Sequence, residues 1–256
     1  MSVSGNPSPV SSVQLHYRVD GDDWNTIAAN LAGGIFTAII PQQPCLKKVN
    51  FYFSASTQNN FEGCLPVGGP NSFYSAISAE SVAQWDSSEM SDFFVVDQDV
   101  WGGAWEYGSL INENNGVAPD RPYSDNWGTW VTGLNLGANL VGGPTELISP
   151  AYDWKDFDLV VMSFARWFSA DIPGNDSFSV SISENDGLSW NVIDESKLPI
   201  STWVLKQYEF RENLSSKTRL KFAAQNNSYD SVHESAIDDF KVEGYSCRLP
   251  SDGMNR

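Results

Sequence analysis

Two adjacent acids, Asp238 and Asp239, begin the closing stretch IDDFKVEGYSC, whose apolar and polar residues alternate as in a β-strand. Successive strand side chains face opposite ways, so Asp238 is expected to share a face with Phe240 and Val242 and to point toward the core. A buried carboxylate without a partner is costly. The sequence therefore predicts a compensating partner for Asp238: backbone N–H groups, a basic side chain such as Arg166, or a metal ion.

The two histidines, His16 and His233, lie in different predicted domains. A histidine metal centre or a Ser-His-Asp triad would therefore rest on a single imidazole. His16 is expected to be a surface or satisfied strand residue, and His233 a solvated loop residue near the aspartate pair. The motifs GxSxG, HExxH and GxxxxGK[ST] are absent from the sequence. We therefore expect a protein without enzymatic activity.

Paired carboxylates are the enzymatic alternative, because a glycosidase needs only two acids that flank the sugar bond. Four acids stand next to or near a tryptophan in the sequence, namely Asp86, Glu106, Asp153 and Asp156. In a chain with 32 Asp and Glu residues, such neighbours arise by chance. A carboxylate-dependent, glycoside-active enzyme is thus the less favoured reading.

The chain has 10 tryptophans, and four of them crowd the loop-rich stretch from VWGGAWEYG to SDNWGTW: Trp101, Trp105, Trp127 and Trp130. Flat aromatic faces stack on sugar rings, so these residues are the candidates for carbohydrate binding. The structural alternative is that they fill a sandwich core or fix long loops in place.

The charge balance bounds the possible partners. Among 256 residues, 15 Lys and Arg stand against 32 Asp and Glu, a formal net charge of −17. Such a chain is a poor partner for nucleic acid or an anionic membrane, whereas divalent cations suit it. An acidic surface that keeps a secreted protein soluble is the plainer explanation. No apolar run is long enough for a membrane span, which argues against membrane insertion.

Three cysteines occur, Cys45, Cys64 and Cys247, and none has the spacing of a metal-binding pair. Cys45 and Cys64 flank a predicted strand and its loop, so we expect a disulfide between them, with two buried thiols as the alternative. Cys247 has no obvious mate in the sequence. It is expected to be free or to pair outside this fragment.

Short runs of alternating or aromatic residues, separated by Gly, Pro, Asn and Asp, predict an all-β chain. Residues 13–79 have the size and strand rhythm of a small immunoglobulin or fibronectin III sandwich. Residues 80–247 carry eight or more strands and predict a larger jelly-roll sandwich. Residues 1–12 lack the features of a signal peptide and are expected to be a linker or an artificial start behind an added Met, and 248–256 a C-terminal tail.

The stretch SENDGLSW at 183–190 resembles the Asp-box pattern SxDxGxxW. In that pattern the Asp and Gly close a tight turn and the Trp packs beneath it. We therefore expect a hairpin here between two apolar runs. A single copy implies nothing about sugar hydrolysis.

Six pieces of the sequence, in order, resemble the pattern of MAM-like jelly-roll domains. They are GGAWEYG, PDRPYSDNWGTWVTG, GGPTELISPAYD, SFARWFSAD, FSVSISENDGLSW and AIDDFKVEGYSC, within roughly 85–247. The domain before them, with CLKKVNFYFSAS and NSFYSAIS, looks like the Ig-like module that commonly precedes this jelly roll in bacterial extracellular proteins.

This resemblance implies an accessory or adhesion module of a secreted or cell-surface bacterial protein, often a metallopeptidase. The module would bind protein or glycan, or a neighbouring domain of its parent protein. The resemblance also implies a structural calcium ion, held by Asp238, Asp239 and Asp86, the best match for the acid near the first strand. Relatives tend to carry aspartates before the GGPT turn, where this chain has Asn139, Leu140 and Val141. Calcium needs six to eight oxygen ligands, so backbone carbonyls and water would have to complete its shell.

Overall fold

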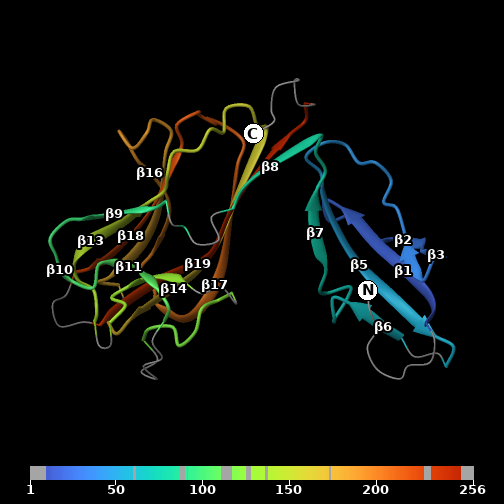
Figure 1. Cartoon of the computed structure of the whole chain (residues 1–256), viewed down its shortest axis with the longest axis horizontal. Coiled ribbons are helices and arrows are strands. Elements are labelled where there is room, and N and C mark those ends of the chain that lie inside the picture. Colours follow the sequence, from blue (N-terminus) through green and yellow to red (C-terminus); the bar gives the residue numbers. More distant parts are fainter. Residues whose placement is uncertain are drawn as a thin grey trace. The chain divides into compact units, whose positions relative to one another are not determined.

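The computed structural model describes residues 10–59, 62–86, 90, 92–110, 117–124, 128–135, 138–172, 174–227 and 232–248 (Figure 1). The chain divides into two compact units, which are described separately. Unit 1 comprises Met1–Ser81 and Tyr245–Arg256, and unit 2 comprises Val82–Gly244. Strands are the only regular elements in the described ranges, so the all-β prediction is confirmed. The described residues contain no helix long and apolar enough to cross a membrane.

Unit 1 is built on one five-stranded antiparallel sheet with the order β2-β1-β5-β6, in which β7 also pairs with β5, and on a separate pair β3-β4. Its strands are β1 (Val10–Val19), β2 (Asn25–Ala28), β3 (Asn30–Ala32), β4 (Ile35–Thr37), β5 (Lys48–Thr57), β6 (Glu62–Leu65) and β7 (Tyr74–Ile77). Val13, Leu15 and Val49 form the buried part of one face. This core is small, so we expect the disulfide described next to contribute to the stability of unit 1.

The disulfide of unit 1 joins Cys45 to Cys247, with a Cα–Cα distance of 5.7 Å. The predicted pairing of Cys45 with Cys64 is wrong, and Cys64 is a free, half-buried cysteine. Cys64 lies opposite Ser54, well along β5, whereas Cys45 precedes the start of that strand. The residues from Tyr245 onward belong to unit 1, although the sequence placed the second domain boundary at 247.

The remaining strands build two six-stranded antiparallel sheets. They are β8 (Ser81–Asp86), β9 (Phe94–Asp97), β10 (Val100–Gly102), β11 (Trp105–Gly108), β12 (Thr129–Thr132), β13 (Val141–Ile148), β14 (Leu159–Ala170), β15 (Ser177–Ser183), β16 (Asn191–Ser196), β17 (Ile200–Phe210), β18 (Arg219–Asn226) and β19 (His233–Ser246).

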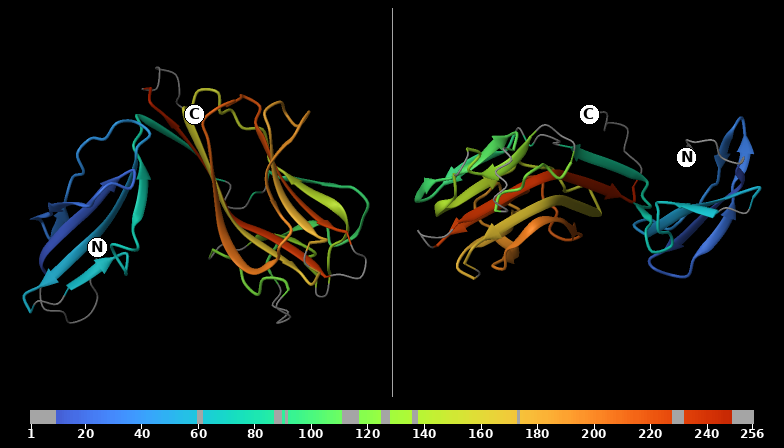
Figure 2. Two further views of the ribbon diagram at one scale, coloured as in Figure 1. Left: turned by 180° about the vertical axis from the view of Figure 1, so that it is seen from behind. Right: turned by 90° about the horizontal axis from the view of Figure 1, so that it is seen from below.

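The last eight strands have the connectivity of a jelly roll. One sheet has the order β12-β19-β14-β17 and the other β13-β18-β15-β16, so the chain alternates between the two sheets along most of its length. Strands β11 and β8 extend the first sheet, and β10 and β9 extend the second. Figure 2 shows the two layers from two further sides. The predicted larger jelly-roll sandwich is therefore present in unit 2.

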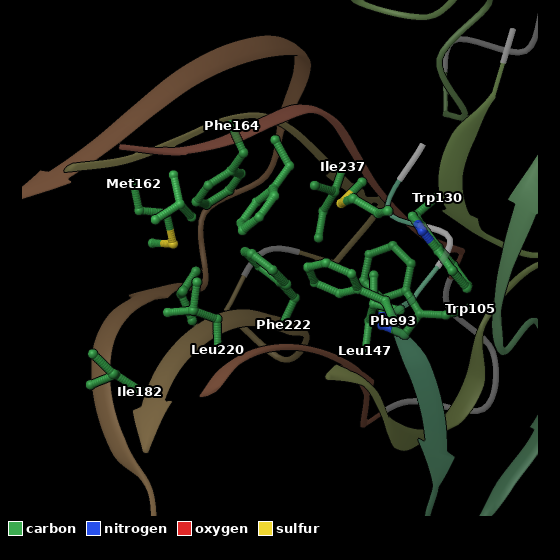
Figure 3. Packing of buried hydrophobic residues seen from close by; sticks show 14 of the residues in the cluster. Phe93, Trp105, Trp130, Leu147, Met162, Phe164, Ile182, Leu220, Phe222 and Ile237 are labelled. Atoms are coloured by element: carbon green, nitrogen blue, oxygen red, sulfur yellow. The ribbon is translucent and has the colours of Figure 1, made fainter. Parts of the chain in front are cut away.

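The core of unit 2 lies between the two sheets and is rich in aromatic residues (Figure 3). Phe164 from β14 packs against Phe222 from β18, with ring centroids 4.9 Å apart. Ile237 from β19 and Leu147 from β13 belong to the same cluster and are fully buried. Along each strand, these side chains alternate with outward-facing residues. The buried positions therefore determine which residues lie on the outer faces of the sheets.

The predicted alternation along β19 is interrupted at Asp239, which has a positive φ of 50°. Ile237 and Phe240 both belong to the core cluster, although they are three residues apart. Asp238 therefore points to the outer face of its sheet, and the expectation that it shares a face with Phe240 is wrong. An extra residue in one strand of an antiparallel pair has this effect on side-chain direction.

The Asp-box stretch forms the predicted hairpin turn between β15 and β16. Asp186 and Gly187 both have positive φ values, of 61° and 87°. The hydroxyl of Ser183 accepts a hydrogen bond from the Gly187 N–H at 2.8 Å, and Arg219 Nε donates to Asp186 Oδ1 at 2.7 Å. The stretch closes the turn and has a structural role.

Candidate functional site

Asp238 lies on the outer face of the β12-β19-β14-β17 sheet and is only 1% exposed. Its carboxylate accepts hydrogen bonds from the Ser124 N–H at 3.0 Å, from the Ser124 hydroxyl at 3.2 Å and from the Asp239 N–H at 2.7 Å. The partner of the buried carboxylate is therefore a set of N–H and O–H donors. Both Ser124 contacts come from residues 117–124, which we call the covering segment.

Two indole rings attach the covering segment to the same sheet face. Trp167 on β14 donates its Nε1–H to the Val117 carbonyl at 2.7 Å. Trp203 on β17 donates its Nε1–H to the Arg121 carbonyl at 3.0 Å. Together with Asp238, side chains from three neighbouring strands hold the beginning, the middle and the end of the segment.

The same two tryptophans and Tyr123 form a cluster that we call the aromatic surface. The ring centroids of Tyr123 and Trp203 are 6.2 Å apart, and those of Trp167 and Trp203 are 5.9 Å apart. Both pairs meet edge to face, a favourable geometry for aromatic rings. Tyr123 is 44% exposed, the two indoles are partly exposed, and Leu205 beside Trp203 along β17 is 55% exposed.

Of the four tryptophans named from the sequence, the three that the structure describes are not brought together as a platform. Trp105 and Trp130 are 3% and 8% exposed and belong to the core, so the core-filling alternative is correct for them. Trp101 on β10 is 77% exposed and lies on the other sheet. Trp127 lies outside the described residues.

The three predicted calcium ligands have different positions. Asp238 is buried beneath the covering segment, and Asp239 is exposed at the irregularity of β19. Asp86 ends β8, and its side chain is not among those described. In the described ranges, no group of three or more His, Cys, Asp and Glu side chains could hold a metal ion. Calcium binding stays a prediction, and its test is given below.

The candidate carboxylates of a glycosidase take part in contacts within the chain. Glu106 Oε2 accepts a hydrogen bond from the Leu134 N–H at 2.8 Å. Asp153 and Asp156 both lie beside Lys155, with N–O distances of 3.2 and 4.0 Å. These are ordinary surface contacts, and the side chain of Asp86, the fourth candidate, lies outside the described residues.

A buried polar row contains the second histidine. His233 Nε2 lies 2.8 Å from the Ser235 hydroxyl, and its Nδ1 lies 3.6 Å from Asp176 Oδ2. The order acid, imidazole, hydroxyl is that of a catalytic triad, but each of the three residues is at most 1% exposed. Burial lowers the pKa of His233, against the opposing effect of Asp176. The expectation of a solvated loop histidine is wrong, and substrate has no access to this row.

His16 is a satisfied strand residue, as expected. Its ring nitrogens lie 2.8 Å from the Ser54 hydroxyl and 3.0 Å from the Thr26 hydroxyl, and the ring stacks on Tyr52 with centroids 4.4 Å apart. Burial lowers its pKa. Unit 1 thus uses its histidine for sheet packing.

Arg166, the alternative partner named for Asp238, points into the core instead. It is 4% exposed and lies over the Phe178 ring at 5.7 Å. Burial lowers the pKa of its guanidinium, and the charge of Asp194 opposes that shift. Its Nε and Nη1 have no hydrogen-bond partner among the described residues. Arg166 is therefore a buried cation whose desolvation costs folding free energy.

The aromatic surface was not predicted from the sequence. Trp167 and Trp203 occur in runs that were predicted as strands, and each was a candidate for either face. Alternation places Trp203 opposite in direction to Val204, but the pairing of Val204 with the core-facing Arg166, which turns Trp203 outward, comes from the structure. No pattern in the sequence indicated that Tyr123 would lie beside them.

The chain is thus an all-β protein whose larger unit is a jelly-roll sandwich with one covered sheet face. No family model matches the sequence, and no curated protein matches it. The K1 cleaved adhesin domain of Lys-gingipain from Porphyromonas gingivalis W83 is similar in structure, with 18% identity, a TM-score of 0.43, and 65% of this chain and 98% of that chain covered.

Two structures of carbohydrate-binding modules resemble this chain to a comparable degree. A family 11 carbohydrate-binding module from Clostridium thermocellum, in complex with a β-1,3-1,4-mixed-linked tetrasaccharide, has 13% identity and a TM-score of 0.40, with 65% of this chain and 98% of that chain covered. TmCBM61, in complex with β-1,4-galactotriose, has 11% identity and a TM-score of 0.39, with 61% and 90% covered. Likenesses this distant assign no function.

Proposed function

We propose that the chain is a non-catalytic accessory or adhesion module that binds glycan through the aromatic surface of unit 2. The observation that carries this proposal is the aromatic surface itself, three partly exposed rings on one sheet face. Both indoles of the surface are tied to the covering segment by hydrogen bonds, so the rings are ordered before a ligand arrives. Preordered rings cost little conformational entropy on binding.

The absence of catalysis is part of the proposal. It is supported by the burial of Asp176, His233 and Ser235, the described residues that come nearest to a catalytic arrangement. A buried hydroxyl cannot reach a substrate without local unfolding. The runner-up is a protein ligand, such as a neighbouring domain of a longer parent protein, bound at the same surface.

We further propose that the protein is secreted or exposed at a bacterial cell surface. The Cys45–Cys247 disulfide supports this location, because disulfides persist in oxidising compartments. The formal net charge of −17 suits a soluble extracellular protein and disfavours nucleic acid as a partner. Kinship with MAM-like jelly rolls and with an Ig-like module belongs to the same proposal, and the strand order of unit 2 supports it.

Titration of the whole chain against soluble neutral polysaccharides tests the function. Tyr123→Ala removes an exposed ring and is expected to weaken binding at least tenfold, about 1.4 kcal/mol. Trp203→Ala is expected to weaken it further, since it removes a second ring and one attachment of the covering segment. Trp101→Ala is the matched control, an exposed tryptophan on the other sheet. Equal affinities for all variants, or no binding on a broad glycan array, would refute the proposal.

A further inference from the structure

The buried carboxylate of Asp238 is surrounded by hydrogen-bond donors. Two backbone N–H groups, from Ser124 and Asp239, and the Ser124 hydroxyl point at its two oxygens. The N–H groups present hydrogen to the carboxylate and have no lone pair to offer a cation. Calcium requires six to eight oxygens at 2.3–2.6 Å, and it would displace these donors. The donor set around Asp238 therefore does not fit a cation site.

We infer that Asp238 is a positioning residue of the aromatic surface, which it serves by holding the covering segment through Ser124. Its effect on ligand affinity rests on the proposed function, whereas its effect on the covering segment does not. Ser124 directly follows Tyr123, so the bonds to Asp238 fix the backbone at the residue that carries the most exposed ring. Within the covering segment, these bonds are the described attachment that follows Tyr123.

The local backbone explains why an aspartate occupies this position. Alternation after the core-facing Ile237 points Asp238 toward the covering segment, and the positive φ of Asp239 returns Phe240 to the core face. The Asp239 N–H lies 2.7 Å from the carboxylate. Charged acceptors make hydrogen bonds roughly twice as strong as neutral ones. Because Asp238 is only 1% exposed, hydrogen bonds from the covering segment replace those that water would make to an exposed carboxylate.

The attachments by Trp167 and Trp203 lie earlier in the segment, at Val117 and Arg121. Loss of the Asp238 attachment is therefore expected to free the end of the segment and leave its beginning in place. This local effect separates a positioning residue from a residue that stabilises unit 2 as a whole.

Hydrogen exchange of the ligand-free chain tests the inference directly. In Asp238→Ala, the Ser124 amide is expected to exchange at least about tenfold faster than in the wild type, while core amides of β14 and β18 stay protected. Asp238→Asn retains an acceptor oxygen and is expected to keep part of the protection of the Ser124 amide. This variant replaces Asp238→Ala in the experiment if the alanine variant does not fold. Asp153→Ala is the matched control, because Asp153 is an exposed acid of unit 2. Unchanged exchange of Ser124 in both Asp238 variants would overturn the inference.

Excess EDTA and added calcium form the second arm of the experiment. If Asp238 holds Ser124 without a cation, the exchange rate of the Ser124 amide should be the same in EDTA and in calcium. If EDTA speeds the exchange of the Ser124 amide and calcium slows it again, the inference is overturned in favour of a bound cation. Glycan titration of Asp238→Asn is the third arm, and weaker binding there than in Asp153→Ala is expected. If the wild type binds no glycan while the exchange results hold, the proposed function fails and the positioning of the segment stands.

Discussion

Removal of the Cys45–Cys247 disulfide is expected to destabilise unit 1 and to leave unit 2 folded. Although the two cysteines are 202 residues apart in sequence, unit 2 shortens the effective loop. Its entry strand β8 pairs with its exit strand β19, so a folded unit 2 brings the two chain ends together. The closed loop then has roughly 40 residues, for which chain entropy gives a stabilisation of about 4 kcal/mol. The full separation would give only about 5 kcal/mol, because the dependence on length is logarithmic.

Calorimetry of Cys45→Ser should therefore show a lower unfolding temperature for unit 1 alone. For a domain of this size, about 4 kcal/mol corresponds to a shift of roughly 16 °C or more. A reducing agent should have the same effect on the wild-type protein. Cys64→Ser is the matched control and should leave both transitions unchanged, since Cys64 is free. A shift in Cys64→Ser equal to that in Cys45→Ser would refute the reasoning.

Three further substitutions in unit 2 test its core and buried polar groups. Phe222→Ala is expected to cost about 3–5 kcal/mol in chemical denaturation, because the fully buried ring leaves a cavity; a loss below about 1 kcal/mol would contradict the packing described. Arg166→Met is expected to raise the stability of unit 2 by about 1 kcal/mol or more, since Asp194 keeps Lys206 at 3.0 Å and Tyr208 at 2.6 Å as partners; destabilisation would show that the guanidinium is satisfied. Burial lowers the pKa of His233 in the folded state, so the unfolded state binds the proton first and stability should fall as pH drops below about 6.5. His233→Gln should flatten that dependence in denaturation curves measured across this range, and an unchanged slope would assign it to other groups.

The strands of unit 2 were predictable where long alternating runs faced a core. The sequence run LVVMSFARWFSA at 159–170 coincides with β14 (Leu159–Ala170), and the runs SFSVSISEN at 177–185 and TRLKFAAQN at 218–226 lie within a few residues of β15 and β18. Short strands such as β6 and β10 were not predicted, because three or four residues hold too little periodicity. They form through pairing with longer neighbours, which is a tertiary effect.

The candidate site shows where local pattern reasoning fails. The need of Asp238 for a partner followed from its expected burial, and the structure confirms both. The partner, Ser124, is 114 residues away in sequence, and no local rule connects the two. The direction of the carboxylate also depended on one backbone irregularity at Asp239, which alternation alone does not reveal. Likewise, the mate of Cys45 is the last cysteine, because the C-terminal segment belongs to unit 1.

The irregularity at Asp239 also restricts how β19 can pair with its neighbours. Before it, odd-numbered Ile237 faces the core, and after it even-numbered Phe240 and Val242 do. A slip of the strand by one residue would improve neither half, because it would turn the buried residues of both halves outward and a carboxylate inward. The central strand of this sheet therefore has a single workable alignment, and an insertion or deletion within residues 237–240 should be far less tolerated than a substitution there.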